Sequence, residues 1–211
     1  MKKWVKAVIS VTLFAGLFVG TAFAAETKKT SDSGLGKYGK LTIGYATGGA
    51  DAEWDFGEGS KFNTVIYYSG FEVVPTFGIE FPVTALEEKK MNLALEGSIG
   101  LTFGGDSAGA YESSTIVINP GVMGIINYHF DNLPKLVPYV GLGFSVPIQL
   151  VSVEYTYTST ETDSTEVGFK INTLFGARYD INDKFSALGE FGLGIFGVFS
   201  WAIRAGVSYH F

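Results

Sequence analysis

The amino-acid sequence predicts an all-β protein, an eight-stranded antiparallel up-and-down transmembrane β-barrel. Three observations point to this class. The chain opens with an export signal, its later segments alternate apolar and polar residues, and short connections alternate with longer ones. The composition agrees, because 28 glycines, 18 phenylalanines and 11 tyrosines accompany only 17% charged residues. Beyond the first segment, no apolar run reaches the roughly 18 residues that indicate a membrane-spanning helix.

The first segment has the three parts of a secretory signal peptide. Lys2, Lys3 and Lys6 precede an apolar run that closes with Ala22-Phe23-Ala24. The apolar run is shorter than the roughly 20 residues of a spanning helix. We expect a signal peptide over residues 1–24, a flexible polar leader over residues 25–36, and the barrel domain over residues 37–211. The sequence has no cysteine, so neither a disulfide nor a lipid-bearing cysteine is expected.

Charge argues against one class of partner. The signal peptide carries three lysines and no acid, so its removal takes the formal net charge from −6 to −9. An acidic chain without a basic cluster is not expected to bind nucleic acid.

Eight segments follow in which apolar residues recur at every second position. In the first four segments these residues are, in chain order, Leu41, Ile43 and Tyr45; Phe71, Val73, Phe77, Ile79, Phe81 and Val83; Leu93, Leu95, Ile99, Leu101 and Phe103; and Ile118, Val122, Ile126, Tyr128 and Phe130. In the last four they are Val140, Leu142, Phe144, Val146 and Ile148; Val167, Phe169, Ile171, Phe175 and Tyr179; Phe185, Ala187, Phe191 and Leu193; and Trp201, Ile203, Ala205, Val207, Tyr209 and Phe211. Successive side chains of a strand point to opposite faces, so each segment is expected to have one apolar face.

The connections between these segments differ in length. Residues 84–90, 131–135 and 180–184 form short connections, residues 47–68, 104–114 and 152–164 form longer ones, and residues 194–200 are intermediate. Short turns at one end and longer loops at the other are typical of outer-membrane barrels, whose turns lie in the periplasm.

The polar parity of the strands is expected to fill the lumen, and the apolar parity to face lipid. The polar parity is rich in small residues, which suit the narrow interior of an eight-stranded barrel. It also holds charges of both signs, which need partners when buried. These charges are Lys40, Lys170, Arg178, Arg204, Glu72, Glu80, Glu96 and Glu190.

Ion pairs in the lumen are expected from Lys170, Arg178, Glu190, Arg204 and Glu96, with Glu190 paired to Arg178 or Arg204. The alternative is that these charges line a narrow pore. Filling is favoured, because side chains occupy the interior of a barrel of this size.

Aromatic residues cluster towards the ends of the expected strands. Those near the short turns suit a periplasmic girdle, and those at the other end suit an outer girdle. The first set is Tyr128, Phe130, Tyr179, Phe185, Tyr209 and Phe211, and the second is Trp201, Phe103, Phe144 and Phe169. The alternative is that aromatic side chains simply fill a core.

Catalytic and metal-binding patterns are weak. The two histidines, His129 and His210, fall in the polar parity, and Ser208 lies two residues before His210. A serine and a histidine on one face resemble a nucleophile and its base, but a lipid-cleaving barrel needs them at its outer rim. We therefore expect no enzyme, no cofactor and no metal.

The longer loops are acidic, with Asp51, Glu53, Asp55 and Glu58 in the first and Glu161, Asp163 and Glu166 around the third. They suit either a surface for divalent cations or host proteins, or simply solvated loop tips. Their spacing fits no calcium-binding loop, and solvated tips are favoured.

Two sequence features resemble a known superfamily. The final strand ends Val207-Ser-Tyr-His-Phe211, which resembles the C-terminal signature of outer-membrane barrels, and Pro138-Tyr-Val-Gly-Leu-Gly-Phe144 resembles a strand common in small barrels. The whole chain after the signal is similar to the eight-stranded superfamily of the OmpA transmembrane domain, OmpX and OmpW. The resemblance implies outer-membrane lipid as surroundings, and recognition of Tyr209 and Phe211 by the barrel-assembly machinery. Unlike in full-length OmpA, no peptidoglycan-binding domain is expected after the barrel.

We expect a bacterial outer-membrane protein that acts as a structural or surface-interaction platform, whose exposed loops meet an extracellular ligand. The alternative is a narrow channel or an uptake route for small hydrophobic molecules. A lateral gap or an apolar upper lumen would favour that route, and a fully bridged polar lumen would oppose it.

Overall fold

The computed structural model describes residues 36–55, 61–81, 83, 86, 88, 90–108, 111–155, 161–195 and 199–211. The expected signal peptide and all but the last residue of the expected leader therefore lie outside the described residues. The strands are β1 (Gly36–Asp55), β2 (Lys61–Phe81), β3 (Met91–Ala108), β4 (Tyr111–Tyr128), β5 (Leu136–Ser145), β6 (Ile148–Tyr155), β7 (Glu161–Val167), β8 (Lys170–Asp180), β9 (Phe185–Gly194) and β10 (Ser200–His210). No helix of the described residues is long and apolar enough to cross a membrane.

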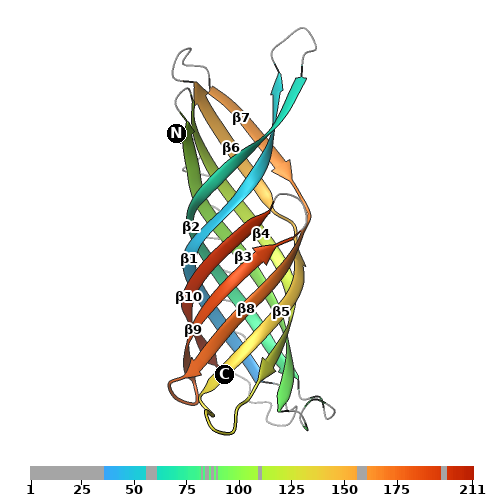
Figure 1. Ribbon diagram of the computed structural model, residues 1–211, viewed down its shortest axis with the longest axis vertical. Helices are drawn as coiled ribbons and strands as arrows, with labels where there is room; N and C mark the ends of the chain where they lie inside the picture. Colours follow the sequence, from blue (N-terminus) through green and yellow to red (C-terminus); the bar gives the residue numbers. More distant parts are fainter. Residues whose placement is uncertain are drawn as a thin grey trace.

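The strands form one antiparallel sheet that closes on itself (Figure 1). β1 pairs with β2 on one side and with β10 on the other, and β3 pairs with both β2 and β4. β4 then continues to β5 and β6, β5 pairs with β8, and β8 and β10 both pair with β9. Among the described residues, every strand has at least two neighbours except β7, which pairs with β6 alone. A closed sheet is the condition for strands to cross a lipid bilayer.

The ten strands make eight strand positions in the barrel. β4 pairs with β5 at Gly121–Ser145 and with β6 at Ile118–Ile148. The register against β4 is the same in both pairings, so β5 and β6 together occupy one strand position. β7 and β8 likewise continue one register against β6 and β5. The interruption falls at Pro147, which has no N–H to give to the ladder, although its carbonyl still accepts from the Gly168 N–H at 2.9 Å. The prediction of an eight-stranded antiparallel barrel is confirmed.

Three pairs of strands are longer than the sequence predicts. Residues 47–68, 104–114 and 152–164 were expected to be loops, but β1–β2, β3–β4 and β6–β7 continue as paired hairpins through much of each range. We call the end of the barrel formed by these hairpins the hairpin end. The opposite end, where the turns at residues 131–135 and 181–184 and the C-terminus lie, is the turn end (Figure 1).

The β9–β10 pair is shorter than the others at the hairpin end. Its ladder stops at the Gly194–Ser200 pair, whereas β1 and β7 continue beyond that level. Above it, no backbone ladder joins β7 to β1 among the described residues. The side-chain amide of Gln149, on β6, donates to the carbonyl of Gly49, on β1, at 3.2 Å. Among the described residues, the sheet is therefore closed by backbone ladders up to the end of β9–β10, and above that level β7 and β1 do not pair.

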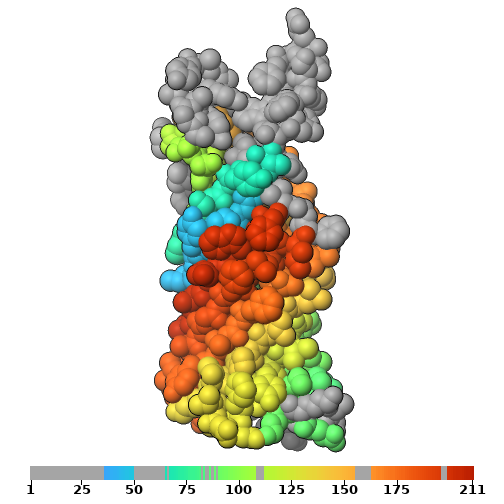
Figure 2. Space-filling view, viewed as in Figure 1, coloured from blue at the N-terminus to red at the C-terminus, as the bar shows by residue number. Residues whose placement is uncertain are grey.

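The two faces of the wall follow the predicted parity. On β9, Ser186, Leu188 and Glu190 are buried in the lumen, whereas Phe185 and Phe191 are exposed. The outer surface carries many exposed apolar side chains, among them Leu41, Ile43, Leu142, Ile203 and Val207. Figure 2 shows one side of this surface, where β10, β9, β8 and β5 pack in successive diagonal bands. An apolar exterior around a polar interior is the reverse of a soluble barrel and suits lipid.

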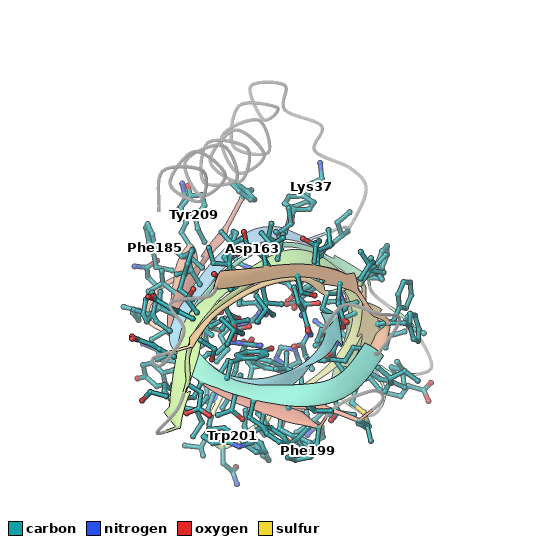
Figure 3. The ribbon with its side chains drawn as sticks, turned by 90° about the horizontal axis from the view of Figure 1, so that it is seen from above. Lys37, Asp163, Phe185, Phe199, Trp201 and Tyr209 are labelled. Carbon is teal, nitrogen blue, oxygen red and sulfur yellow. The ribbon has the colours of Figure 1, made fainter. Side chains whose placement is uncertain are left out.

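Aromatic side chains contact one another on the outer surface near both ends of the wall. Near the turn end, the rings of Tyr209 lie 5.0 Å from Phe185 and 5.2 Å from Phe211, centroid to centroid. Towards the hairpin end, Tyr45 lies 6.0 Å from Trp201, and Phe144 lies 6.2 Å from Phe169. In the view down the barrel axis, Phe185, Tyr209, Phe199 and Trp201 lie outside the ring of strands (Figure 3). These rings occupy the positions expected of two girdles.

Candidate functional site in the barrel lumen

The middle of the lumen holds a buried lysine between two carboxylates. Lys40 Nζ lies 2.8 Å from Glu96 Oε2 and 2.8 Å from Glu190 Oε1. The hydroxyl of Tyr38 donates to Glu96 at 2.7 Å, and that of Tyr139 donates to Glu190 at 2.8 Å. All three charged side chains are at most 8% exposed. Buried charges are stable only when they are paired and hydrogen-bonded, and this cluster supplies both.

A second ion pair extends the cluster towards the hairpin end. Arg204 Nε lies 2.6 Å from Glu72 Oε2, and its Nη1 lies 3.8 Å from Glu190 Oε2. Thr102 makes a long contact of 3.5 Å with the other Glu72 oxygen. Glu190 therefore interacts with both cations, so that Glu96, Lys40, Glu190, Arg204 and Glu72 form one continuous chain of alternating charge.

A third ion pair lies near the turn end. Arg178 Nη1 lies 2.9 Å from Glu80 Oε1, and its Nε lies 3.1 Å from Asp180 Oδ1. The ring of His210 lies 5.6 Å from that of Tyr38, and its Nε2 is buried without a hydrogen-bond partner. Charged side chains therefore occupy the lumen at three successive levels.

The sequence-predicted lumen residues are placed as follows. Glu190 and Arg204 come together, and Glu96 pairs with Lys40. The expected alternative of Glu190 with Arg178 is wrong, because Arg178 pairs with Glu80 and Asp180 and lies opposite Leu188 in the β8–β9 register. Among the described residues, Lys170 lies in no ion pair, and its amine donates to Ser200 Oγ at 2.8 Å.

Sequence reasoning missed the tyrosines of the lumen. Tyr38, Tyr139 and Tyr68 each stand directly opposite a glycine of the neighbouring strand, in the pairs Tyr38–Gly78, Tyr139–Gly176 and Tyr68–Gly48. A Cβ added at any of these glycines would lie closer than 3.0 Å to atoms of the tyrosine ring. Each ring therefore lies flat against a strand that has no side chain there. Tyrosine and glycine at cross-strand positions of the polar parity are the signal that could have found them.

The lumen changes character towards the hairpin end. Val117, Val151 and Val153 are buried there, above the ion pairs. Between them and the ion pairs is a cavity of about 90 Å³, whose lining includes Lys170 and Asn119. The upper lumen is thus partly apolar, while the middle is bridged by charge.

The serine and histidine singled out in the last strand do not form a catalytic pair. Ser208 Oγ and His210 Nε2 are each buried without a hydrogen-bond partner. Among the described residues there is also no cluster of three or more His, Asp or Glu side chains suited to a metal ion. The lumen of the described barrel is therefore a site of charge pairing.

A closed eight-stranded antiparallel wall, apolar outside and charged inside, defines the fold of an outer-membrane β-barrel. No family model and no curated protein matches the sequence. Among solved structures, the chain is similar to the outer membrane protein OprG from Pseudomonas aeruginosa, with a TM-score of 0.52 and 13% identity over 83% of this chain and 96% of that one. It also matches Ail, the attachment invasion locus protein of Yersinia pestis (TM-score 0.47, 12% identity, 82% and 98% coverage). For Neisserial surface protein A, the TM-score is 0.45 and the identity is 16%, over 85% of this chain and 98% of that one. At these identities the likeness to OprG shows the fold alone.

Proposed function

We propose that this chain is a bacterial outer-membrane protein that acts as a non-enzymatic structural or surface-interaction platform. The observation that supports the proposal is the chain of five alternating charges across the lumen. Lys40 and Arg204 come from β1 and β10, Glu72 from β2, Glu96 from β3 and Glu190 from β9. These buried pairs connect five neighbouring strands, and opening a path through them would leave charges unpaired at a cost of several kcal/mol.

The location follows from the same features. The apolar outer surface and its two aromatic bands suit a lipid bilayer, and the export signal expected over residues 1–24 suits passage to the outer membrane. In this orientation the turn end faces the periplasm and the hairpins face the exterior. Tyr209 and Phe211 at the C-terminus then serve as the signal for the barrel-assembly machinery.

The hairpins are the part of the platform that would meet a partner. β1–β2, β3–β4 and β6–β7 continue beyond the end of β9–β10, and β6–β7 presents the exposed Asp163. Backbone hydrogen bonds hold the paired strands of these hairpins at fixed positions more firmly than a loop would be held. An extracellular ligand would therefore meet a preorganised surface.

One observation favours the alternative, an uptake route for small hydrophobic molecules. The upper lumen contains buried valines, and no ladder joins β7 to β1 above β9–β10 in the described part of the chain. A molecule could pass between the upper lumen and the lipid there without crossing the ion pairs. This route needs no continuous pore.

Planar-bilayer conductance of the refolded protein separates the platform from a pore. The platform predicts no current above leak, while a general porin in the same bilayers conducts. Stable single-channel steps from the wild-type protein would contradict it. The uptake route is tested with lipid vesicles and a small apolar fluorescent probe, where faster entry into protein-containing vesicles than into empty ones would favour the alternative.

A further inference from the structure

Several glycines border the cavity in the upper lumen, among them Gly100, Gly121, Gly192 and Gly194. Its volume of about 90 Å³ leaves room for a few water molecules. A cavity of this size with both polar and apolar lining residues is suited to a small guest that carries polar groups.

Lys170 reaches this cavity along an unusual path. Lys170 lies on β8, and its amine contacts Ser200 Oγ on β10, so the side chain crosses over β9. It crosses at Gly194, where an added Cβ would lie 2.7 Å from Lys170 Cδ. The amine has three N–H donors, and the contact to Ser200 uses one. Lys170 thus brings a positive charge to the cavity wall with donors to spare.

The nearby carboxylate is already neutralised. Glu72 borders the cavity, but its Oε2 accepts from Arg204 Nε at 2.6 Å. In the described part of the chain, the cavity lining holds three charged residues, Glu72, Arg204 and Lys170. Glu72 and Arg204 pair with each other, whereas Lys170 lies in no ion pair among the described residues. An anion in the cavity would supply the partner that a largely buried ammonium requires.

The opposite wall offers an acceptor. Asn119 lies on β4, and its Oδ1 is buried without a hydrogen-bond partner. It stands opposite Gly100 in the β3–β4 register, and Asn119 itself borders the cavity. A buried polar atom without a partner costs about 1–3 kcal/mol, so a guest with a hydroxyl group would gain by donating to it.

We propose that the upper-lumen cavity binds a small hydroxycarboxylate. The carboxylate accepts from the Lys170 amine, and the hydroxyl donates to Asn119 Oδ1. The cavity lies at the level of Gly194 and Ser200, where the β9–β10 ladder ends, so the guest can enter from the hairpin side of the ion pairs. The site does not depend on whether the barrel also carries apolar molecules.

The test uses the refolded barrel in detergent micelles and sodium glycolate as the probe, at neutral pH and constant ionic strength. The amide resonances of Lys170, Gly194, Ser200 and Gly100 report binding by nuclear magnetic resonance. We expect saturable shifts with glycolate, weaker binding of acetate, which has no hydroxyl group, and no saturable shift with neutral ethylene glycol. Shifts that grow linearly with glycolate, or equal affinity for acetate and glycolate, would overturn the proposal.

Two variants assign the contacts. Lys170→Gln keeps a donor for Ser200 but removes the charge, and we expect at least a tenfold loss of glycolate affinity. Lys135→Gln, at an exposed lysine of the 131–135 turn, is the matched control and should bind as the wild type does. Asn119→Leu should lower glycolate affinity to that of acetate, and it provides an independent test if the first variant does not fold. Unchanged glycolate affinity in either lumen variant would contradict the proposed site.

Discussion

The amine of Lys40 lies 2.8 Å from Oε1 of Glu190, although 150 residues separate the two in sequence. Lys40 is on β1 and Glu190 is on β9, and β10 lies between them in the wall. The two side chains therefore meet by crossing the lumen over a strand. This contact joins the two ends of the chain and is the centre of the charge network.

Removing the Glu190 charge should destabilise the barrel. In Glu190→Gln, Lys40 keeps Glu96 and Arg204 keeps Glu72, so we expect a loss of about 3 kcal/mol, at the low end for a broken buried pair. Urea unfolding in lipid vesicles measures the change, and heat-modifiable gel mobility checks that the barrel forms. Glu112→Gln, at an exposed site on β4, is the control and should change stability little. A Glu190→Gln barrel as stable as the wild type would mean that the network is not stabilising.

The contact of Tyr38 with Gly78 gives a second prediction. In Gly78→Ala, the new methyl group would clash with the Tyr38 ring and displace its hydroxyl from Glu96. Overpacking of this kind costs about 1–3 kcal/mol. The free energy of unfolding should fall by that amount.

Gly189→Ala is the matched control for this substitution. Gly189 lies exposed on β9, and an added Cβ would meet nothing within 4 Å. Equal effects of the two substitutions on stability would show that the cost comes from backbone propensity and not from the ring.

The aromatic bands predict where Trp201 lies in a bilayer. With Trp54 replaced by phenylalanine and the signal peptide removed, Trp201 is the single tryptophan. Lipids brominated near the headgroup should quench its fluorescence more than lipids brominated near the chain ends. A tryptophan moved to position 43, in Ile43→Trp with Trp201→Phe, should show the opposite order. The same order for both positions would contradict two interfacial bands.

The sequence predicted the wall well and the contacts inside it poorly. Ile203 and Arg204 could be assigned to opposite faces, because alternation is a local property of a strand. The partner of Arg178 could not be assigned, because Glu80 lies on β2, which is not a neighbour of β8, and the two side chains meet across the lumen. Long side chains cross a narrow barrel, and only the closed structure shows which of them meet.

The length of the paired hairpins could not be predicted from the sequence for a different reason. Residues 47–55 and 61–68 pair as strands, yet the sequence there does not alternate strictly. Above the end of β9–β10 a strand need not present one face to lipid and one to a packed lumen. The period-two signal on which the prediction depended is therefore weaker there.

The account depends most on the claim that the apolar face of the wall meets lipid. Ile43 and Ile181 test it, because both are about half exposed but only Ile43 lies in the wall, opposite Ala205 and midway between Trp201 and Tyr209. Arginine at the bilayer midplane costs about 2–4 kcal/mol, whereas arginine in a turn costs little. Urea unfolding of the two variants in lipid vesicles should therefore show a loss of about 2–4 kcal/mol for Ile43→Arg and almost none for Ile181→Arg. Equal stabilities of the two variants would contradict a lipid-facing wall.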